Sequence, residues 1–232
     1  MRHPIYRDND TEKIRDTIKA KHFFLWLLTT LWVTPLFAAQ TPIKILDQNG
    51  DPVANAVISY ADATPPAQAL PNAIMDQVDK QFLPNVLIIQ RDQSVTFPNS
   101  DNIRHHIYSF SKPKPFEIRM FKGGEFKSVT FNEPGIVVLG CNIHDQMIGY
   151  IYVADHKQTV LSDSDGIAVI DSGAQELTIW HSQLSANNIT RVTIPLSDVV
   201  KNNNSVNLKL LPKKVAKPQR KFGSSNFGSK GN

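Results

Sequence analysis

The sequence of 232 residues predicts an all-β protein, and three observations lead to that prediction. Short segments rich in β-branched and aromatic residues recur along the chain, among them residues 95–97, 106–110, 128–131 and 148–153. Turn signals such as Gly123-Gly124 and Pro134-Gly135 lie between them. Beyond the first 39 residues the chain contains no long amphipathic helical pattern.

Residues 1–39 are predicted to be a signal peptide or an N-terminal anchor. Lys19 and Lys21 precede an apolar run, and Pro35 stands just before the small residues that end it. The run is shorter than the roughly 20 apolar residues that a membrane-spanning helix needs, so cleavage near Gln40 is the favoured interpretation. We therefore expect an exported, periplasmic protein, with membrane contact only if this segment is not cleaved.

Two separate pieces, residues 41–62 and 157–211, are expected to form one discontinuous β-sandwich. The first contains Asn49-Gly50 between two predicted strands, and the second contains Asp165-Gly166 between two more. Together these pieces resemble carboxypeptidase regulatory-like domains, which implies that the segment between them is inserted in a loop of that sandwich. The alternative is that both pieces add strands to one enlarged sheet.

The inserted segment, residues 75–155, contains a short loop that concentrates metal-binding side chains. Cys141, His144 and Met147 lie within seven residues, after the buried-type strand 136–139 and before a strand expected to begin just after Met147. Upstream, the adjacent pair His105 and His106 stands at the start of another predicted strand.

One thiolate, two imidazoles and a weak thioether are the ligand set of a mononuclear electron-transfer copper site. Sulfur ligands suit Cu(I) and imidazole suits either oxidation state, so this set can hold copper through a redox cycle. We therefore predict a single copper ion held by Cys141, His144, Met147 and one of the two upstream histidines. Side chains alternate across a strand, so only one of His105 and His106 can readily face the metal.

Other interpretations of Cys141 remain open at this point. It is the only cysteine, so it cannot form an intramolecular disulfide. A buried structural thiol and a catalytic Cys-His pair are both possible, but neither explains Met147 or the two upstream histidines. Zinc could use the same residues, although a thioether is a poor ligand for zinc. No combination of nucleophile, base and orienting group points to hydrolysis, so we do not expect an enzyme.

Residues 75–155 resemble a cupredoxin of the plastocyanin and amicyanin type, in Phe82–Ile89, Asp92–Asn99 and Gly140–Met147. They also resemble cupredoxin-type proteins labelled methylamine utilization proteins, in Ile103–His106 and Cys141–Asp145, although no methylamine pathway follows from that label. The resemblance implies a Greek-key β-sandwich with one type 1 (blue) copper. It also selects His105, because the first copper histidine in this family comes six residues after the asparagine matched by Asn99.

The predicted function is the transfer of single electrons between redox partner proteins. By resemblance, His144 would be the exit for the electron, and Asp145 and Gln146 would border the docking surface. A copper carrier or storage protein without a redox partner is the alternative. A further alternative is a structural β-protein in which the Cys141 thiol has no functional role.

The C-terminal segment, residues 212–232, is predicted to be a disordered basic tail. It carries six lysine and arginine residues and no acidic residue, and it contributes much of the basic pI of about 9.1. The chain has no basic face interleaved with aromatic residues, so binding to nucleic acid is not expected.

Overall fold

The computed structural model describes residues 40–61, 72–155, 158–171 and 173–212. Strands dominate these residues, and the helix among them, α2 (Leu196–Lys201), is six residues long. The predicted all-β fold class is therefore confirmed. The predictions for residues 1–39 and for the tail beyond Pro212 fall outside the described residues. Within the described part of the chain, no helix is long and apolar enough to cross a membrane.

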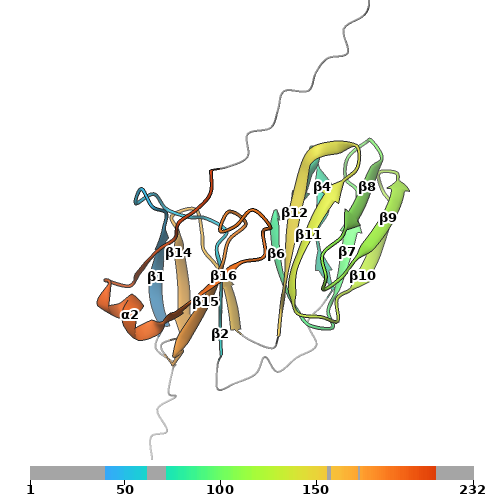
Figure 1. Cartoon of the computed structure of the whole chain (residues 1–232). Coiled ribbons are helices and arrows are strands. Elements are labelled where there is room, and N and C mark those ends of the chain that lie inside the picture. Colours follow the sequence, from blue (N-terminus) through green and yellow to red (C-terminus); the bar gives the residue numbers. More distant parts are fainter. Residues whose placement is uncertain (1–39, 62–71, 156–157, 172, 213–232) are drawn as a thin grey trace, which may run out of the picture. The chain divides into compact units, whose positions relative to one another are not determined.

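The strands between residues 73 and 154 form two sheets and a small hairpin, which we call the inner sandwich (green to yellow in Figure 1). One sheet has the order β10 (Phe126–Thr130), β7 (Ser94–Pro98), β3 (Ala73–Ile74). The other has the order β6 (Val86–Gln90), β12 (His144–Ala154), β11 (Gly135–Cys141), β8 (His105–Ser109), β9 (Phe116–Phe121). The hairpin pairs β4 (Asp76–Val78) with β5 (Gln81–Leu83).

The core of the inner sandwich follows from the two-residue period of its strands. In β7, for example, Val95 and Phe97 are fully buried, while Ser94, Thr96 and Pro98 are partly exposed. These two side chains pack with buried residues of the five-stranded sheet, including Leu139 and Ile151. Cys141 and Met147 belong to the same core, so the predicted metal-binding loop borders the apolar interior.

The strands outside residues 73–154 form two further sheets, which we call the outer sheets. One has the order β14 (Ile167–Asp171), β1 (Gln40–Leu46), β17 (Ser205–Asn207). The other has the order β13 (Gln158–Leu161), β2 (Val57–Tyr60), β15 (Glu176–Trp180), β16 (Arg191–Pro195). Figure 1 shows β1 (blue) beside β14 (orange), although more than a hundred residues separate them in sequence. Residues of both outer sheets pack into one common core, among them Ile45 and Ile58.

The turn at Asn49-Gly50 is present, and Gly50 has a φ of +85°, which a glycine adopts easily. The strands on either side of this turn do not pair with each other, because β1 and β2 belong to different outer sheets. No sheet within the described residues combines strands of the inner sandwich with strands of the outer sheets. That pattern fits an inserted segment, and the insertion and its boundaries stay predictions.

The five-stranded sheet of the inner sandwich is covered on its second face by side chains from β2 and β15. Trp180 of β15 is fully buried and lies edge-on to Tyr150 of β12, with ring centroids 5.5 Å apart. It also contacts Tyr152, and its indole N–H donates to the Asn188 carbonyl at 2.8 Å. Strand β12 is therefore buried on both faces over its second half, which explains the apolar run that ends it.

We predict that Trp180→Ala lowers the free energy of unfolding by about 3–5 kcal/mol, because it opens a large cavity between packed strands. Chemical denaturation measures this change. Val169→Ala is the control, since Val169 is 45% exposed on β14 and its truncation should cost little. Equal losses in the two variants would contradict the packing role of Trp180.

Candidate metal centre

The loop that carries Cys141 is a two-residue turn, and the strand after it begins earlier than the sequence suggested. β11 ends at Cys141, and Cys141 pairs with His144, the first residue of β12. The expectation that this strand begins just after Met147 is therefore wrong. The pairing then shifts, because the preceding residue, Gly140, pairs with Ile148. Between these two pairs β12 contains three residues and β11 none, which is a bulge.

The two adjacent histidines of β8 point to opposite faces of their sheet, as the alternation of a strand requires. His105 is fully buried. His106 faces the other way, where its Nε2 lies 2.9 Å from Oε1 of Glu117. The structure therefore brings His105, and not His106, to the buried side with Cys141.

His105, Cys141 and His144 form a group that could hold a metal ion, with all ligand atoms within 4.8 Å of one another. Nδ1 of His105 lies 3.8 Å from Sγ of Cys141, and Nδ1 of His144 lies 3.7 Å from the same sulfur. The two imidazole rings are tilted by 57° with centroids 5.0 Å apart, so they converge on the sulfur without stacking.

These separations fit a metal placed between the three side chains. Typical bond lengths are about 2.0 Å for a metal to an imidazole nitrogen and about 2.3 Å for a metal to a thiolate sulfur. With bond angles near 120°, such bonds place the sulfur and each nitrogen about 3.7 Å apart. The Cys141 sulfur therefore lies from each of the two imidazole nitrogens at the spacing that a shared metal ion would require.

Met147 lines the same hollow as His144. Its side chain is 1% exposed and belongs to the same apolar core as Cys141. The bulge explains this placement, since two residues three apart on a regular strand would face opposite sides. The assignment of its thioether as a fourth ligand stays a prediction.

Asp101 is part of the site, although no motif in the sequence pointed to it. Its Oδ2 lies 2.6 Å from Nε2 of His105, on the side of the ring away from Cys141. Its carboxylate also accepts the backbone N–H groups of Asp79 and Lys80. Burial opposes ionisation of Asp101, but these hydrogen bonds outweigh it and hold the pKa of the carboxyl below its usual value.

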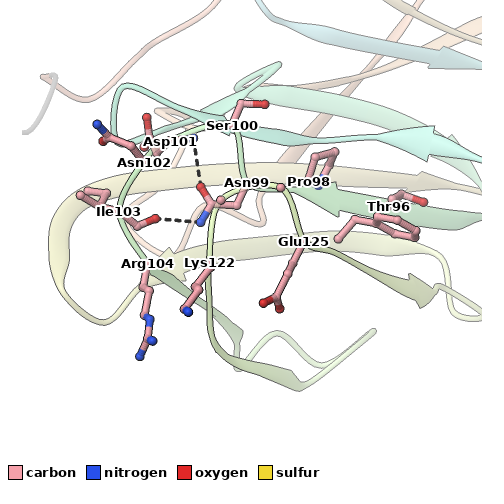
Figure 2. A pocket seen from close by; sticks show the side chains of 13 residues that line it. Thr96, Pro98, Asn99, Ser100, Asp101, Asn102, Ile103, Arg104, Lys122 and Glu125 are labelled. Carbon is pink, nitrogen blue, oxygen red and sulfur yellow. Dashed lines mark hydrogen bonds between the residues drawn. The ribbon is translucent and has the colours of Figure 1, made fainter.

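The loop that leads into His105 is held by Asn99, which is 1% exposed (Figure 2). Its side-chain amide donates to the carbonyls of Ile103 and Phe121, and its oxygen accepts the backbone N–H of Asp101. Gly123 packs so closely against this loop that an added Cβ would lie 2.3 Å from the Asp101 carbonyl oxygen. Asn99 was noticed in the sequence only through its spacing from His105, and the structure supplies its physical role.

His144 is the ligand candidate nearest to the surface. It is partly exposed and lines a hollow together with Lys80, Ile143, Asp145 and Gln146. Burial is the main cause that lowers the pKa of His144, and the neighbouring His105 and Lys80 add to it. The imidazole is therefore neutral at pH 7, which leaves a nitrogen lone pair available to a metal.

No protein-family model matches the chain, and neither does any curated protein. Among solved structures, the chain is similar to a Cu-containing nitrite reductase from Thermus scotoductus SA-01, with 31% identity and a TM-score of 0.35. That match covers 40% of this chain and 26% of the reductase, so the chain spans about a quarter of it.

Two smaller proteins are matched over nearly their whole length. A reduced mutant of amicyanin is 21% identical, with a TM-score of 0.35, over 43% of this chain and 99% of that chain. A purple cupredoxin from Nitrosopumilus maritimus is 22% identical, with a TM-score of 0.33, over 36% of this chain and 100% of that chain.

We predict that Asn99→Ala destabilises the protein by about 1–3 kcal/mol or more, because two carbonyls and one N–H lose their buried partner. Urea denaturation of the metal-free protein measures this loss. Asn102→Ala is the control, since Asn102 is exposed in the same loop. A loss no larger than that of the control would show that Asn99 does not hold the loop.

Proposed function

We propose that this protein is a type 1 copper protein of the cupredoxin kind that carries single electrons between redox partners. His105, Cys141 and His144 would supply two nitrogens and one thiolate, and Met147 the weak axial contact. The observation that carries the proposal is the nearly equal distance, 3.8 and 3.7 Å, from the Cys141 sulfur to the two Nδ1 atoms. This donor set is the one expected for a copper electron-transfer site.

Copper bound there would alternate between Cu(I) and Cu(II), accepting one electron from a reduced partner and giving it to an oxidised one. The residues of the chain keep the donors in place. Cys141 and Met147 are fixed in the apolar core, and His105 is fully buried. Because β11 and β12 are paired on both sides of the bulge and the donor residues are packed around it, the donor atoms have little room to rearrange between the two states.

The partner protein would dock around His144. This side chain is the exposed end of the ligand group and opens into the hollow beside the turn. Ile143 is 45% exposed next to it, while Asp145 and Gln146 are exposed on the same strand end. Protein interfaces commonly have an apolar centre with a polar rim, and Ile143 beside His144, bordered by polar side chains, fits that arrangement.

We also propose that the protein acts after export, as an electron carrier and not as an enzyme. Support for export comes from the basic and apolar N-terminal segment of the sequence. A binuclear copper centre of the cupredoxin type needs two bridging cysteines, and the chain has one.

Loading with Cu(II) should give strong visible absorption from thiolate-to-Cu(II) charge transfer, because Cys141 would be bound directly to the metal. Absorption and electron spin resonance spectra of the protein titrated with Cu(II) make the measurement. Cys141→Ala should abolish the colour. A colourless wild-type protein that has bound Cu(II) would refute the proposed function.

The two adjacent histidines provide an internal control for this experiment. His105→Ala should remove the colour or change it strongly, whereas His106→Ala should leave most of it, since His106 faces Glu117 on the other side of the sheet. Colour that survives loss of His105 but not loss of His106 would reverse the assignment of the ligand.

Met147→Gln should keep copper bound and lower its reduction potential. An amide oxygen is a harder ligand than a thioether and favours Cu(II) over Cu(I), and the axial ligand tunes the potential of such sites. Cyclic voltammetry of the copper-loaded variant and wild type tests this. The same potential in both proteins would show that the thioether does not face the metal.

A further inference from the structure

The carboxylate of Asp101 takes part in three hydrogen bonds, one with His105 of β8 and two with the turn between β4 and β5. Its Oδ2 lies 2.6 Å from Nε2 of His105 and accepts the backbone N–H of Lys80 at 3.0 Å. Its Oδ1 accepts the backbone N–H of Asp79 at 2.7 Å. The side chain is only 13% exposed, so water screens these contacts little.

We propose that Asp101 is a positioning residue that sets the tautomer and orientation of His105 and ties this ligand to the turn between β4 and β5. The inference rests on the proposed function, in which His105 binds the metal. A carboxylate oxygen only accepts hydrogen bonds, so Nε2 of His105 carries the proton. Nδ1 of the neutral ring is then unprotonated, and this is the atom that lies 3.8 Å from the Cys141 sulfur.

The turn between β4 and β5 has a backbone conformation that lets it donate two hydrogen bonds to this carboxylate. Its two central residues, Asp79 and Lys80, both have positive φ, 51° and 59°. That conformation is uncommon for residues other than glycine, and it is the one a two-residue hairpin turn requires. Both central N–H groups are directed at Asp101, which compensates for the strained backbone and fixes the turn relative to His105.

Only a carboxylate satisfies all three donors. In Asp101→Asn the amide nitrogen must replace one of the two oxygens. If it replaces Oδ1, it faces the Asp79 N–H, and two donors oppose each other. If it replaces Oδ2, it donates to Nε2 of His105 and drives the ring proton to Nδ1, where the proton competes with a metal.

The negative charge of Asp101 should also affect the reduction potential of the copper site. A carboxylate hydrogen-bonded to a ligating imidazole raises the basicity of the ring, and a stronger donor favours the more highly charged metal. Asp101 is therefore expected to stabilise the Cu(II) state relative to Cu(I) and to keep the reduction potential lower than it would otherwise be.

A matched control is present on the other face of β8. Glu117 pairs with Nε2 of His106 at 2.9 Å, which is the same chemical contact one residue along the strand. The Glu117 side chain is 57% exposed, and His106 faces away from Cys141. Glu117→Gln therefore removes an imidazole–carboxylate pair without touching the proposed ligands.

The first experiment needs neither copper nor a variant. In the metal-free wild-type protein, long-range proton–nitrogen NMR spectra should show His105 as the Nε2–H tautomer. A His105 ring protonated on Nδ1 would overturn the proposal. Because this readout involves no metal, it decides the role of Asp101 even if the copper-loaded protein proves colourless and the proposed function fails.

The second experiment compares Asp101→Asn and Glu117→Gln after loading with copper. Asp101→Asn should weaken copper binding by about 10–100-fold and raise the reduction potential, as loss of a group that orients a ligand does. Glu117→Gln should match wild type in both properties. A blue Asp101→Asn variant with wild-type affinity and potential would overturn the role of Asp101 and leave the proposed function intact.

Discussion

Regular pairing of β11 with β12 would place His144 and Met147, three residues apart on one strand, on opposite faces of the sheet. The pairing instead shifts between Gly140 and Cys141, and three residues of β12 are taken up in a bulge. The shift brings the His144 imidazole to 3.7 Å from the Cys141 sulfur while Met147 turns into the same core. The approach of the Cys141 thiol to the His144 imidazole, with Met147 buried in the same core, depends on this local break in an otherwise continuous ladder.

A bulge can hold side chains in place only if the strands around it do not move. Strand β12 has the interior of the inner sandwich on one face and Trp180 with its neighbours on the other. A strand packed on both faces has little freedom to slide or twist, because protein interiors are close-packed. His105 is held in a comparable way, by Asp101 at its outer nitrogen and by the loop that Asn99 organises. The outer sheets thus contribute to the rigidity of the site, although none of the candidate ligands lies in them.

Local chemistry made part of this structure predictable. The strand periodicity, the turn at Gly50 and the spacing of Cys141, His144 and Met147 are all visible in short windows of sequence, and strand alternation separates His105 from His106. The bulge was not predictable, since a three-residue shift in pairing leaves the sequence pattern of β12 unchanged. Because of the bulge, β12 begins at His144 and not after Met147. Asp101 lies four residues from His105, but the turn that holds its carboxylate, at Asp79 and Lys80, is more than 20 residues away in sequence. An interaction of that kind depends on tertiary folding, which no short window records.

The central claim is that one preorganised donor set holds copper in both oxidation states. X-ray absorption spectroscopy of a single copper-loaded sample, measured oxidised and then reduced, tests it most directly. We expect one sulfur and two nitrogen neighbours at short distance in both states, with no loss of metal over repeated cycles, because the donors are already close together in the protein alone. A reduced site that loses its thiolate or an imidazole, or that releases copper, would contradict the account and favour a copper carrier.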